Sequence, residues 1–299
     1  MLCNCCGAEI AELDDYKEYK HFRCETCGYE NFLNLNTAIA ADLYENDADY
    51  IDDLNVLTNS EDLLLWHHLK AIKVLQSNLH KSNIKTLDVG CFNGFFVKKM
   101  LSLDYDAEGI DFNKGAVVYG QVKLGLGSRI TTQTLNDLCE QGKRFDVITL
   151  FEVLEHLQDA KVFLNDVVKL LNTGGLLIIS TPNNKMCWRP ALDYPPHHLA
   201  RFTTKSIAGY LNQLGVKTIY SAEQMSTYEL IRHYVGTFFR AKDSVSMRGG
   251  EFRNKRITTI LRRGMNKMRK ILGILLIPLD LLLYVFGFRY ISQIVVAEK

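Results

Sequence analysis

The pattern of hydrophobic and polar positions changes character near residue 85. Residues 37–84 have apolar positions near helical spacing, which predicts a helical lead-in. Over 85–299, short apolar runs alternate with amphipathic segments, which predicts an α/β fold with a doubly wound parallel sheet. The expected strands are IKTLDVG, DAEGIDF, RITTQT, RFDVITLFE, GGLLIISTPN, VKTIYSAE and SQIVVAEK, and the expected helices run through VKKMLSL, GAVVYGQVKLG, DAKVFLNDVVKLL and residues 203–214.

Residues 1–36 are expected to form a separate module around two Cys-x-x-Cys pairs. Cys3 and Cys6 form one pair, Cys24 and Cys27 the other, and a glycine follows each pair. Two such knuckles suit Zn²⁺ held by four thiolates, as in a zinc ribbon. A redox role is disfavoured, because redox pairs open a helix after a strand. Whether the module serves as a lid or as a docking surface stays open.

Charge is distributed unevenly along the 299 residues. The net charge is only +1, and 47% of the residues are hydrophobic, as in a globular protein with a core. Residues 248–270 hold nine Lys or Arg and one Glu, so this block carries 9 − 1 = +8. A basic block on an otherwise acidic chain predicts an anionic partner. No secretory signal is evident, and we expect a cytoplasmic protein.

The turn after the first expected strand, in TLDVGCFNGFF, predicts a small-molecule site. Gly90 and Gly94 allow a sharp turn and a close approach of backbone to a ligand. A dinucleotide fingerprint would have a glycine at Phe92, and Asp88 would repel a pyrophosphate, so we expect a positively charged nucleoside. Asp111 ends the next strand, where a carboxylate can bind ribose hydroxyls. The alternative is that both acids only cap strand ends.

At this point the sequence resembles the class I S-adenosylmethionine (SAM)-dependent methyltransferases, which have a Rossmann-like sheet. The resemblance covers residues 82–230 and the final strand, and rests on LDVGCFNG, Asp111, FDVITLFEVLEHLQD and LLNTGGLLIISTPN. Phe92 departs from the usual GCGxG motif. The resemblance implies that SAM is bound at its methionine part by Asp88, Gly90, Cys91, Phe92, Asn93 and Gly94, at the ribose by Asp111, at the adenine by Phe112, Gln133 and Thr134, and near the sulfonium by Phe151 and Glu152.

Methyl transfer to an oxygen nucleophile needs a base or a metal near the end of the fourth strand. Glu152, Glu155 and His156 would share one face of a helical turn and can bind a divalent cation such as Mg²⁺. The segment resembles the E-x-x-E-H of ubiquinone-pathway O-methyltransferases, which carries a metal. The alternative is that these residues only order the loop.

A second candidate cluster, PPHHLARFT, covers residues 195–203. His197 and His198 can supply a general base, because imidazole titrates near neutrality. Arg201 can hold an anionic group of the substrate. The alternative is that one histidine and Arg201 only tie the loop down.

The apolar run of residues 271–288 has almost the length of a membrane span. Asp280, Pro278 and the strand that follows argue against spanning. We therefore expect an insert over 230–288, with its basic and apolar halves on an anionic membrane surface. The alternative is packing against the protein's own core or a twin subunit. Nucleic acid is disfavoured, because the basic block lacks interleaved aromatics.

Taken together, these features predict a SAM-dependent enzyme that O-methylates an amphiphilic or lipid-linked metabolite, such as a glycan-lipid intermediate or a quinone precursor. It would be peripheral at the inner membrane face. The other interpretations are a non-catalytic zinc- and membrane-docking scaffold with a relic SAM site, and a nucleotide-linked oxidoreductase. The sequence leaves the oligomeric state open.

Overall fold

The computed structural model describes residues 1–34, 64–78, 83–186, 189, 193–224, 226–228, 231, 271–286 and 291–299. The basic block and most of the predicted helical lead-in lie outside these residues. The chain divides into two compact units. The larger unit contains residues 1–184, 194–222 and 292–299, and the smaller unit contains residues 185–193 and 223–291.

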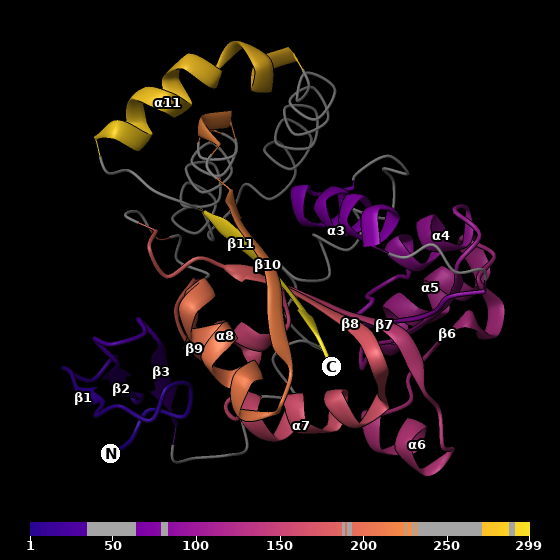
Figure 1. Cartoon of the computed structure of the whole chain (residues 1–299), viewed down its shortest axis with the longest axis horizontal. Helices are drawn as coiled ribbons and strands as arrows, with labels where there is room; N and C mark the ends of the chain where they lie inside the picture. Colours follow the sequence, from indigo (N-terminus) through magenta and orange to yellow (C-terminus); the bar gives the residue numbers. More distant parts are fainter. Residues whose placement is uncertain are drawn as a thin grey trace, which may run out of the picture. The chain divides into compact units, whose positions relative to one another are not determined.

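A seven-stranded sheet forms the centre of the larger unit (Figure 1). Its strand order is β10-β11-β8-β7-β4-β5-β6. The four pairings from β8 to β6 are parallel, and β11 runs antiparallel to β8. The strands are β4 (Lys85–Val89), β5 (Asp106–Ile110), β6 (Ile130–Thr131), β7 (Phe145–Phe151), β8 (Leu171–Pro182), β10 (Lys217–Gln224) and β11 (Ser292–Glu298). The predicted doubly wound α/β fold is therefore confirmed.

Helices cover both faces of this sheet, as the continuous apolar strands require. In β8, Leu177 and Ile179 pack in one core layer, while Leu176 and Ile178 pack in the other. The first layer includes residues of α6 (Leu135–Glu140), α7 (Ala160–Leu170) and α8 (Thr204–Gln213). The second includes residues of α3 (Trp66–Asn78), α4 (Phe95–Leu101) and α5 (Lys114–Lys123). Side-chain caps begin several of these helices, and Thr203 forms a capping box at α8.

The cysteine-bearing module, residues 1–34, forms a second, four-stranded sheet (Figure 1). Three strands come from the module itself: β1 (Ala11–Glu12), β2 (Lys20–Arg23) and β3 (Glu30–Leu33). The fourth, β9 (Ala200–Arg201), comes from the predicted PPHHLARFT cluster and pairs antiparallel with β3. The module's sheet is thus completed by a strand that lies far from the module in sequence.

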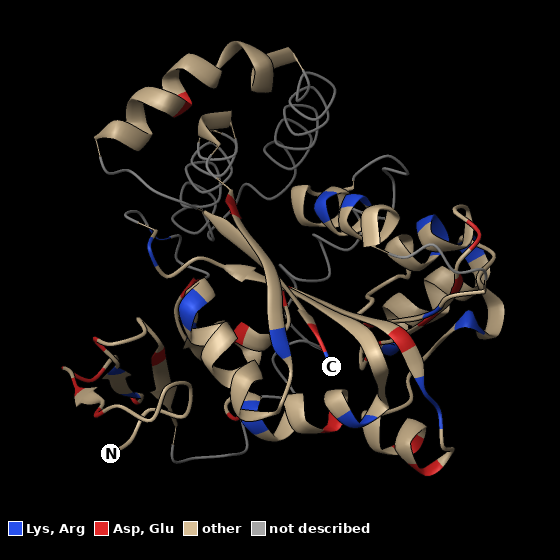
Figure 2. Cartoon of the chain, in the orientation of Figure 1, with Lys and Arg blue, Asp and Glu red and all other residues tan. Residues whose placement is uncertain are grey.

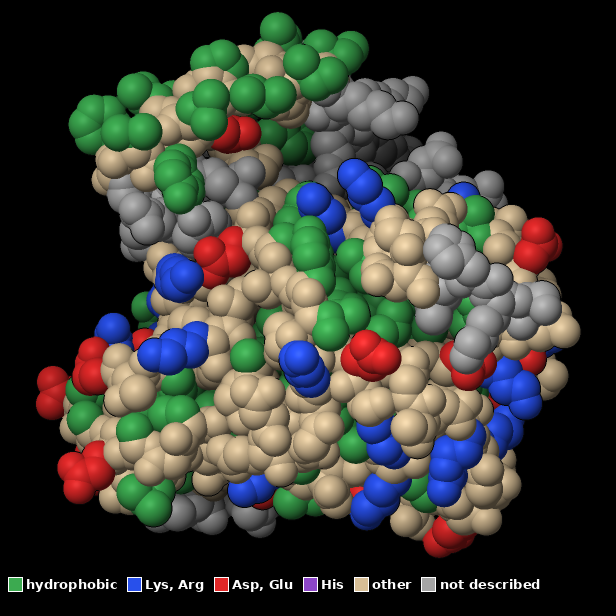
Figure 3. All heavy atoms as spheres, in the orientation of Figure 1, with side chains coloured by type: hydrophobic (Ala, Val, Ile, Leu, Met, Phe, Trp, Pro, Cys, Tyr) green, Lys and Arg blue, Asp and Glu red, His purple; other side chains and the backbone are tan. Residues whose placement is uncertain are grey.

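In the smaller unit, residues 271–275 and α11 (Ile277–Val285) are helical. Pro278 lies in the first turn of α11, where a missing N–H costs nothing. Large apolar side chains of this segment are exposed, Ile274 by 68% and Val285 by 78% (Figure 3). α11 contains Asp280 and no Lys or Arg, so its ribbon in Figure 2 is almost entirely tan. Within the described ranges, no helix is long and apolar enough to cross a bilayer.

Candidate active site

The glycine turn, residues 90–94, follows β4, the strand at which the order of successive strands in the sheet reverses direction. β5 and β6 extend to one side of β4, and β7 and β8 to the other. In doubly wound sheets, ligands bind beyond the carboxyl ends of the strands at such a point. A Cβ on Gly90, which has φ +77°, would lie 2.5 Å from Cγ2 of Val153. Glycine is therefore needed where this turn packs against the turn that follows β7.

Phe92 has a left-handed backbone conformation in the middle of this turn. Its φ is +54°, between Gly90 at +77° and Gly94 at +75°. Such a conformation costs a residue with a side chain roughly 1–2 kcal/mol. Phe92 thus keeps the backbone that a glycine would adopt there, and its N–H donates a 2.8 Å hydrogen bond to Oδ2 of Asp111. Non-glycine residues held this way often mark functional sites.

Asp111, directly after β5, contacts the glycine turn through the hydrogen bond from Phe92. Its side chain is buried, and Oδ1 accepts a second 2.8 Å hydrogen bond from the N–H of Asn113. Burial raises the pKa of Asp111, and the two backbone donors oppose this effect. A carboxylate can accept about four hydrogen bonds. Two acceptor positions therefore remain, which fits a group with two hydroxyls such as a ribose. Phe112 follows and is 56% exposed.

Asp88 lies in β4, beneath the glycine turn. It is buried, and Thr149 of β7 donates a 2.6 Å hydrogen bond from Oγ1 to Oδ1 of Asp88. Burial raises the pKa of Asp88 to about 7, the hydrogen bond from Thr149 lowers it, and the charge of Asp111 raises it further. The carboxyl is thus poised to ionise near neutral pH, and a bound cation would favour the ionised form.

Gln133 and Thr134 follow the short strand β6. Thr134 is the N-cap of α6 and forms a capping box with Asp137. Thr131 Oγ1 lies 3.3 Å from Oε1 of Gln133. Contact of these two residues with an adenine stays a prediction.

Glu152 directly follows β7 and has φ +56°, and the helical turn begins only after it, at Leu154. Its Oε1 accepts a 2.9 Å hydrogen bond from Oγ of Ser180 and lies 3.8 Å from Nδ1 of His67. His67 also stacks on Phe151, with ring centroids 5.0 Å apart. His67 comes from α3 and was not among the residues predicted to form the site.

Glu155 and His156 lie together with His198 rather than with Glu152. One potential ligand atom from each of the three falls within 4.8 Å of the others. His156 is half-buried, and its Nδ1 lies 2.8 Å from the carbonyl oxygen of His197. Burial first, and then the neighbouring charge of His198, lower the pKa of His156 to about 3. The neutral ring therefore donates from Nδ1 and leaves Nε2 as an acceptor.

Arg201 holds its loop to the cysteine-bearing module. Its Nη1 lies 2.8 Å from Oε2 of Glu30, and both side chains are buried. The guanidinium also lies over the rings of Phe32 and Tyr194, at 4.8 and 4.4 Å from their centroids. These contacts tether the loop, and binding of an anionic substrate group by Arg201 stays a prediction.

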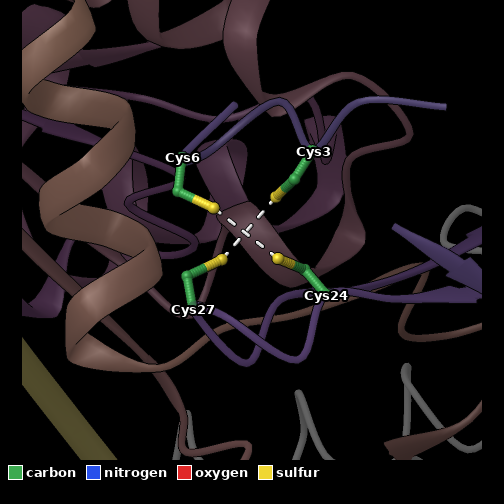
Figure 4. Close-up of side chains that lie close together, drawn as sticks. All are labelled: Cys3, Cys6, Cys24 and Cys27. Atoms are coloured by element: carbon green, nitrogen blue, oxygen red, sulfur yellow. Dashed lines mark hydrogen bonds between the residues drawn. The ribbon is translucent and has the colours of Figure 1, made fainter. Parts of the chain in front are cut away.

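The four cysteines of the module converge on one centre (Figure 4). Their Sγ atoms all lie within 4.8 Å of one another, and the Cys3–Cys27 and Cys6–Cys24 pairs are 3.6 Å apart. A tetrahedral Zn²⁺ with Zn–S bonds of about 2.3 Å would place its sulfurs about 3.8 Å apart. The arrangement therefore fits a four-thiolate zinc site. Cys5 is buried beside this cluster but is not part of it.

Comparisons with known proteins agree with the fold of the larger unit. A family model described as a methyltransferase domain matches residues 65–241, more than half of the chain. Ubiquinone biosynthesis O-methyltransferase of Bartonella tribocorum is 26% identical over 157 residues, which are 45% of this chain and 64% of that protein. The protein of the same name from Cereibacter sphaeroides is 32% identical over 112 residues, 36% and 45% of the two chains. The chain thus spans less than two thirds of these relatives' length.

Solved structures resemble the fold at low sequence identity. Phosphoethanolamine N-methyltransferase 2 of Haemonchus contortus, in complex with S-adenosyl-L-methionine, has a TM-score of 0.55 at 13% identity, covering 90% of this chain and 62% of that one. A SAM dependent methyltransferase from Archaeoglobus fulgidus has a TM-score of 0.53 at 14% identity, covering 85% and 100%. The chain therefore belongs to the methyltransferase domain family and has the fold of class I SAM-dependent methyltransferases.

Proposed function

We propose that the protein transfers the methyl group of SAM to an oxygen atom of an amphiphilic or lipid-linked metabolite. The observation that carries this proposal is the hydrogen bond between Asp111 and the glycine turn, because it leaves a carboxylate with spare acceptor positions beside a bare backbone turn. Asp111 would hold the ribose, and Phe112 would lie beside the adenine, whose edge would meet Gln133 and Thr134. Asp88 and the backbone of residues 90–94 would surround the methionine part.

SAM, when bound, supplies a methyl group on a positively charged sulfur, which is a good leaving group. The protein's own residues must then orient the acceptor and remove its proton. Glu152, His197 and His198 are the proposed bases, since they follow β7 and β8 at the edge of the sheet where ligands bind. Phe151 would border the sulfonium. The names of the relatives, ubiquinone biosynthesis O-methyltransferase, favour an oxygen acceptor and a quinone precursor over a glycan-lipid intermediate.

Two metals enter the proposal with different support. Structural Zn²⁺ at Cys3, Cys6, Cys24 and Cys27 is supported by the sulfur geometry. The sequence predicts a divalent cation such as Mg²⁺ at Glu152, Glu155 and His156. The geometry supports His198 in place of Glu152, since it lies with the other two.

Action at a membrane surface is supported by the exposed apolar side chains of residues 271–286 and by the basic block that precedes them in sequence. The apolar side chains would lie in the interface and the basic block would meet anionic headgroups. The protein would then be peripheral on the cytoplasmic face of the inner membrane.

Incubation with labelled SAM and fractionated membrane lipids tests the proposed reaction. We expect the label in an amphiphilic lipid fraction, and none with Asp111→Asn. Calorimetric titration with S-adenosylhomocysteine (SAH) and with NADH separates the alternatives. NADH binding without SAH binding would favour the nucleotide-linked oxidoreductase. SAH binding without turnover on any fraction would favour the non-catalytic scaffold.

A further inference from the structure

We propose that the zinc module positions the histidine loop, residues 194–203, so that the metal holds the acceptor side of the active site in place. This inference rests on the proposed function, because it assigns the module a task within that reaction. The module is residues 1–34, and the loop carries His197 and His198.

The backbone of Leu199 links the module to the turn after β7. Its carbonyl oxygen accepts a 2.8 Å hydrogen bond from the N–H of Phe32 in β3. Its N–H donates a 2.7 Å hydrogen bond to the carbonyl oxygen of Glu155. One residue therefore connects a strand of the module to the E-x-x-E-H segment, and His197 and His198 directly precede it in the chain.

A buried ion pair fixes the same register. β3 pairs with β9 through Glu30 opposite Arg201, and their side chains meet at 2.8 Å. Burial alone raises the pKa of Glu30, but the hydrogen bonds from His21 and Arg201 outweigh burial and lower the pKa to about 2. Glu30 is therefore ionised when it meets Arg201. Removing one partner of a buried pair leaves an uncompensated charge, so β3 and β9 are strongly coupled.

The second cysteine knuckle is tied directly to the C-terminal end of the loop and to the segment that follows β8. Thr203 Oγ1 donates a 2.6 Å hydrogen bond to the carbonyl oxygen of Cys27. Asn184 Nδ2 donates a 2.7 Å hydrogen bond to the carbonyl oxygen of Gly28. A Cβ added to Gly28 would lie 2.8 Å from Cγ2 of Thr203. A metal bound at Cys27 would therefore fix the carbonyl group that accepts the hydrogen bond from Thr203 at the end of the loop.

The metal's effect on the loop follows from the size of the module. So few residues cannot bury enough apolar surface to be stable alone, and such domains fold with their metal. When zinc leaves, β3 loses its fixed position and β9 loses its partner. The residues proposed to hold the ribose, the adenine and the methionine part of SAM belong to β4 or follow β4, β5 and β6, and β7 separates these strands from β8 in the strand order. Zinc loss should therefore loosen the acceptor side and spare SAM binding.

The test is amide hydrogen exchange on the full-length protein, with and without removal of zinc by a chelator. The amides of Phe32 and Leu199 should exchange at least about tenfold faster without zinc, and those of β4 within about twofold of the untreated protein. Affinity for SAH should change by less than about twofold. Unchanged exchange at Leu199 would overturn the proposal. Equal acceleration in β4 would also overturn it, because the module would then support the whole domain.

Two variants remove the dependence on chelation. Arg201→Met breaks the buried pair and leaves the four cysteines intact. We expect full zinc content, faster exchange at Leu199, and a lower kcat on lipid fractions with an unchanged KM for SAM. Lys20→Met is the matched control, since Lys20 forms only exposed ion pairs with Glu12 and Asp15 in the same module. Slow exchange at Leu199 in Arg201→Met would count against the proposal. If the unmodified protein does not bind SAH, the proposed function fails, while the exchange data still decide this inference.

Discussion

The carboxylate of Asp111 accepts a 2.8 Å hydrogen bond from the backbone N–H of Phe92. This contact joins the end of β5 to the middle of the glycine turn. It also accounts for a phenylalanine in a left-handed conformation, because the N–H must point toward the carboxylate for the bond to form. The position of the Asp111 carboxylate and the conformation of the glycine turn therefore depend on each other.

Asp111→Asn should weaken binding of SAH by at least about tenfold, since hydrogen bonds to a charged group contribute about 1.5–3 kcal/mol. The amide also places an NH₂ group where one of two backbone donors now meets an oxygen. Calorimetric titration measures the change. Asp106→Asn, at the other end of β5, is the control, because the side chain of Asp106 pairs with Arg129 at the surface. Equal affinity of Asp111→Asn and unmodified protein would contradict the ribose role.

Asp88 predicts a pH dependence of folding stability. Its pKa is about 7 in the folded protein, whereas the ordinary value of 3.8 applies in the unfolded chain. Between pH 4 and pH 7 the folded protein keeps a proton that the unfolded chain loses. The free energy of unfolding contributed by Asp88 is therefore complete below pH 4 and falls as the pH rises to 7.

Asp88→Asn removes this dependence, because the amide stays neutral and can still accept from Thr149. From pH 5 to pH 8 the variant should gain about 2 kcal/mol of stability relative to the unmodified protein. Urea unfolding at both pH values measures this difference. A constant difference across the range would show that Asp88 is already ionised in the folded state at pH 5.

Cys24→Ser should abolish stoichiometric zinc binding, because three thiolates and a hydroxyl make a much weaker site. Metal analysis of the purified protein should give one zinc per chain before the change and none after it. Cys139→Ser is the matched control, since Cys139 is half-buried and lies outside the cluster. Zinc content that survives Cys24→Ser would refute the four-thiolate site.

The apolar segment of residues 271–286 should bind anionic vesicles. The double variant Ile274→Asp, Leu281→Asp should reduce partitioning into vesicles that contain phosphatidylglycerol by at least about tenfold, since burial of one such side chain contributes about 1.5–3 kcal/mol. Val122→Asp is the control, because Val122 on α5 is 68% exposed like Ile274. Vesicle flotation gives the bound fraction. Binding that survives the double variant would assign the segment to another partner.

The strands of the fold could be predicted because their apolar runs are long and local. The four cysteines could be predicted because ligand spacing is a local property. β9 could not, since two residues, Ala200 and Arg201, become a strand only through pairing with β3. The prediction that Glu152 and Glu155 share one helical face was wrong. It required a continuous helical turn from residue 152, and the φ of +56° at Glu152 is incompatible with one.

The fold and the family predicted from sequence are both confirmed. The position of His67 beside Glu152 could not be predicted, for a different reason. Its approach to Glu152 depends on how α3 packs against the sheet, which is a tertiary relationship between residues far apart in sequence. The two histidines of the loop and the SAM-holding residues stay predictions that the experiments above decide.

The strand order has a consequence for biosynthesis. β11 lies between β8 and β10, yet residues 225–291 separate it from β10 in sequence. A nascent chain that has already produced the other six strands must wait for this whole segment before its sheet can be completed. During that interval β8 and β10 each present an open hydrogen-bonding edge, the feature that most readily recruits a second chain. Ribosome pausing between the codons for residues 225 and 291 should therefore increase aggregation of the newborn protein.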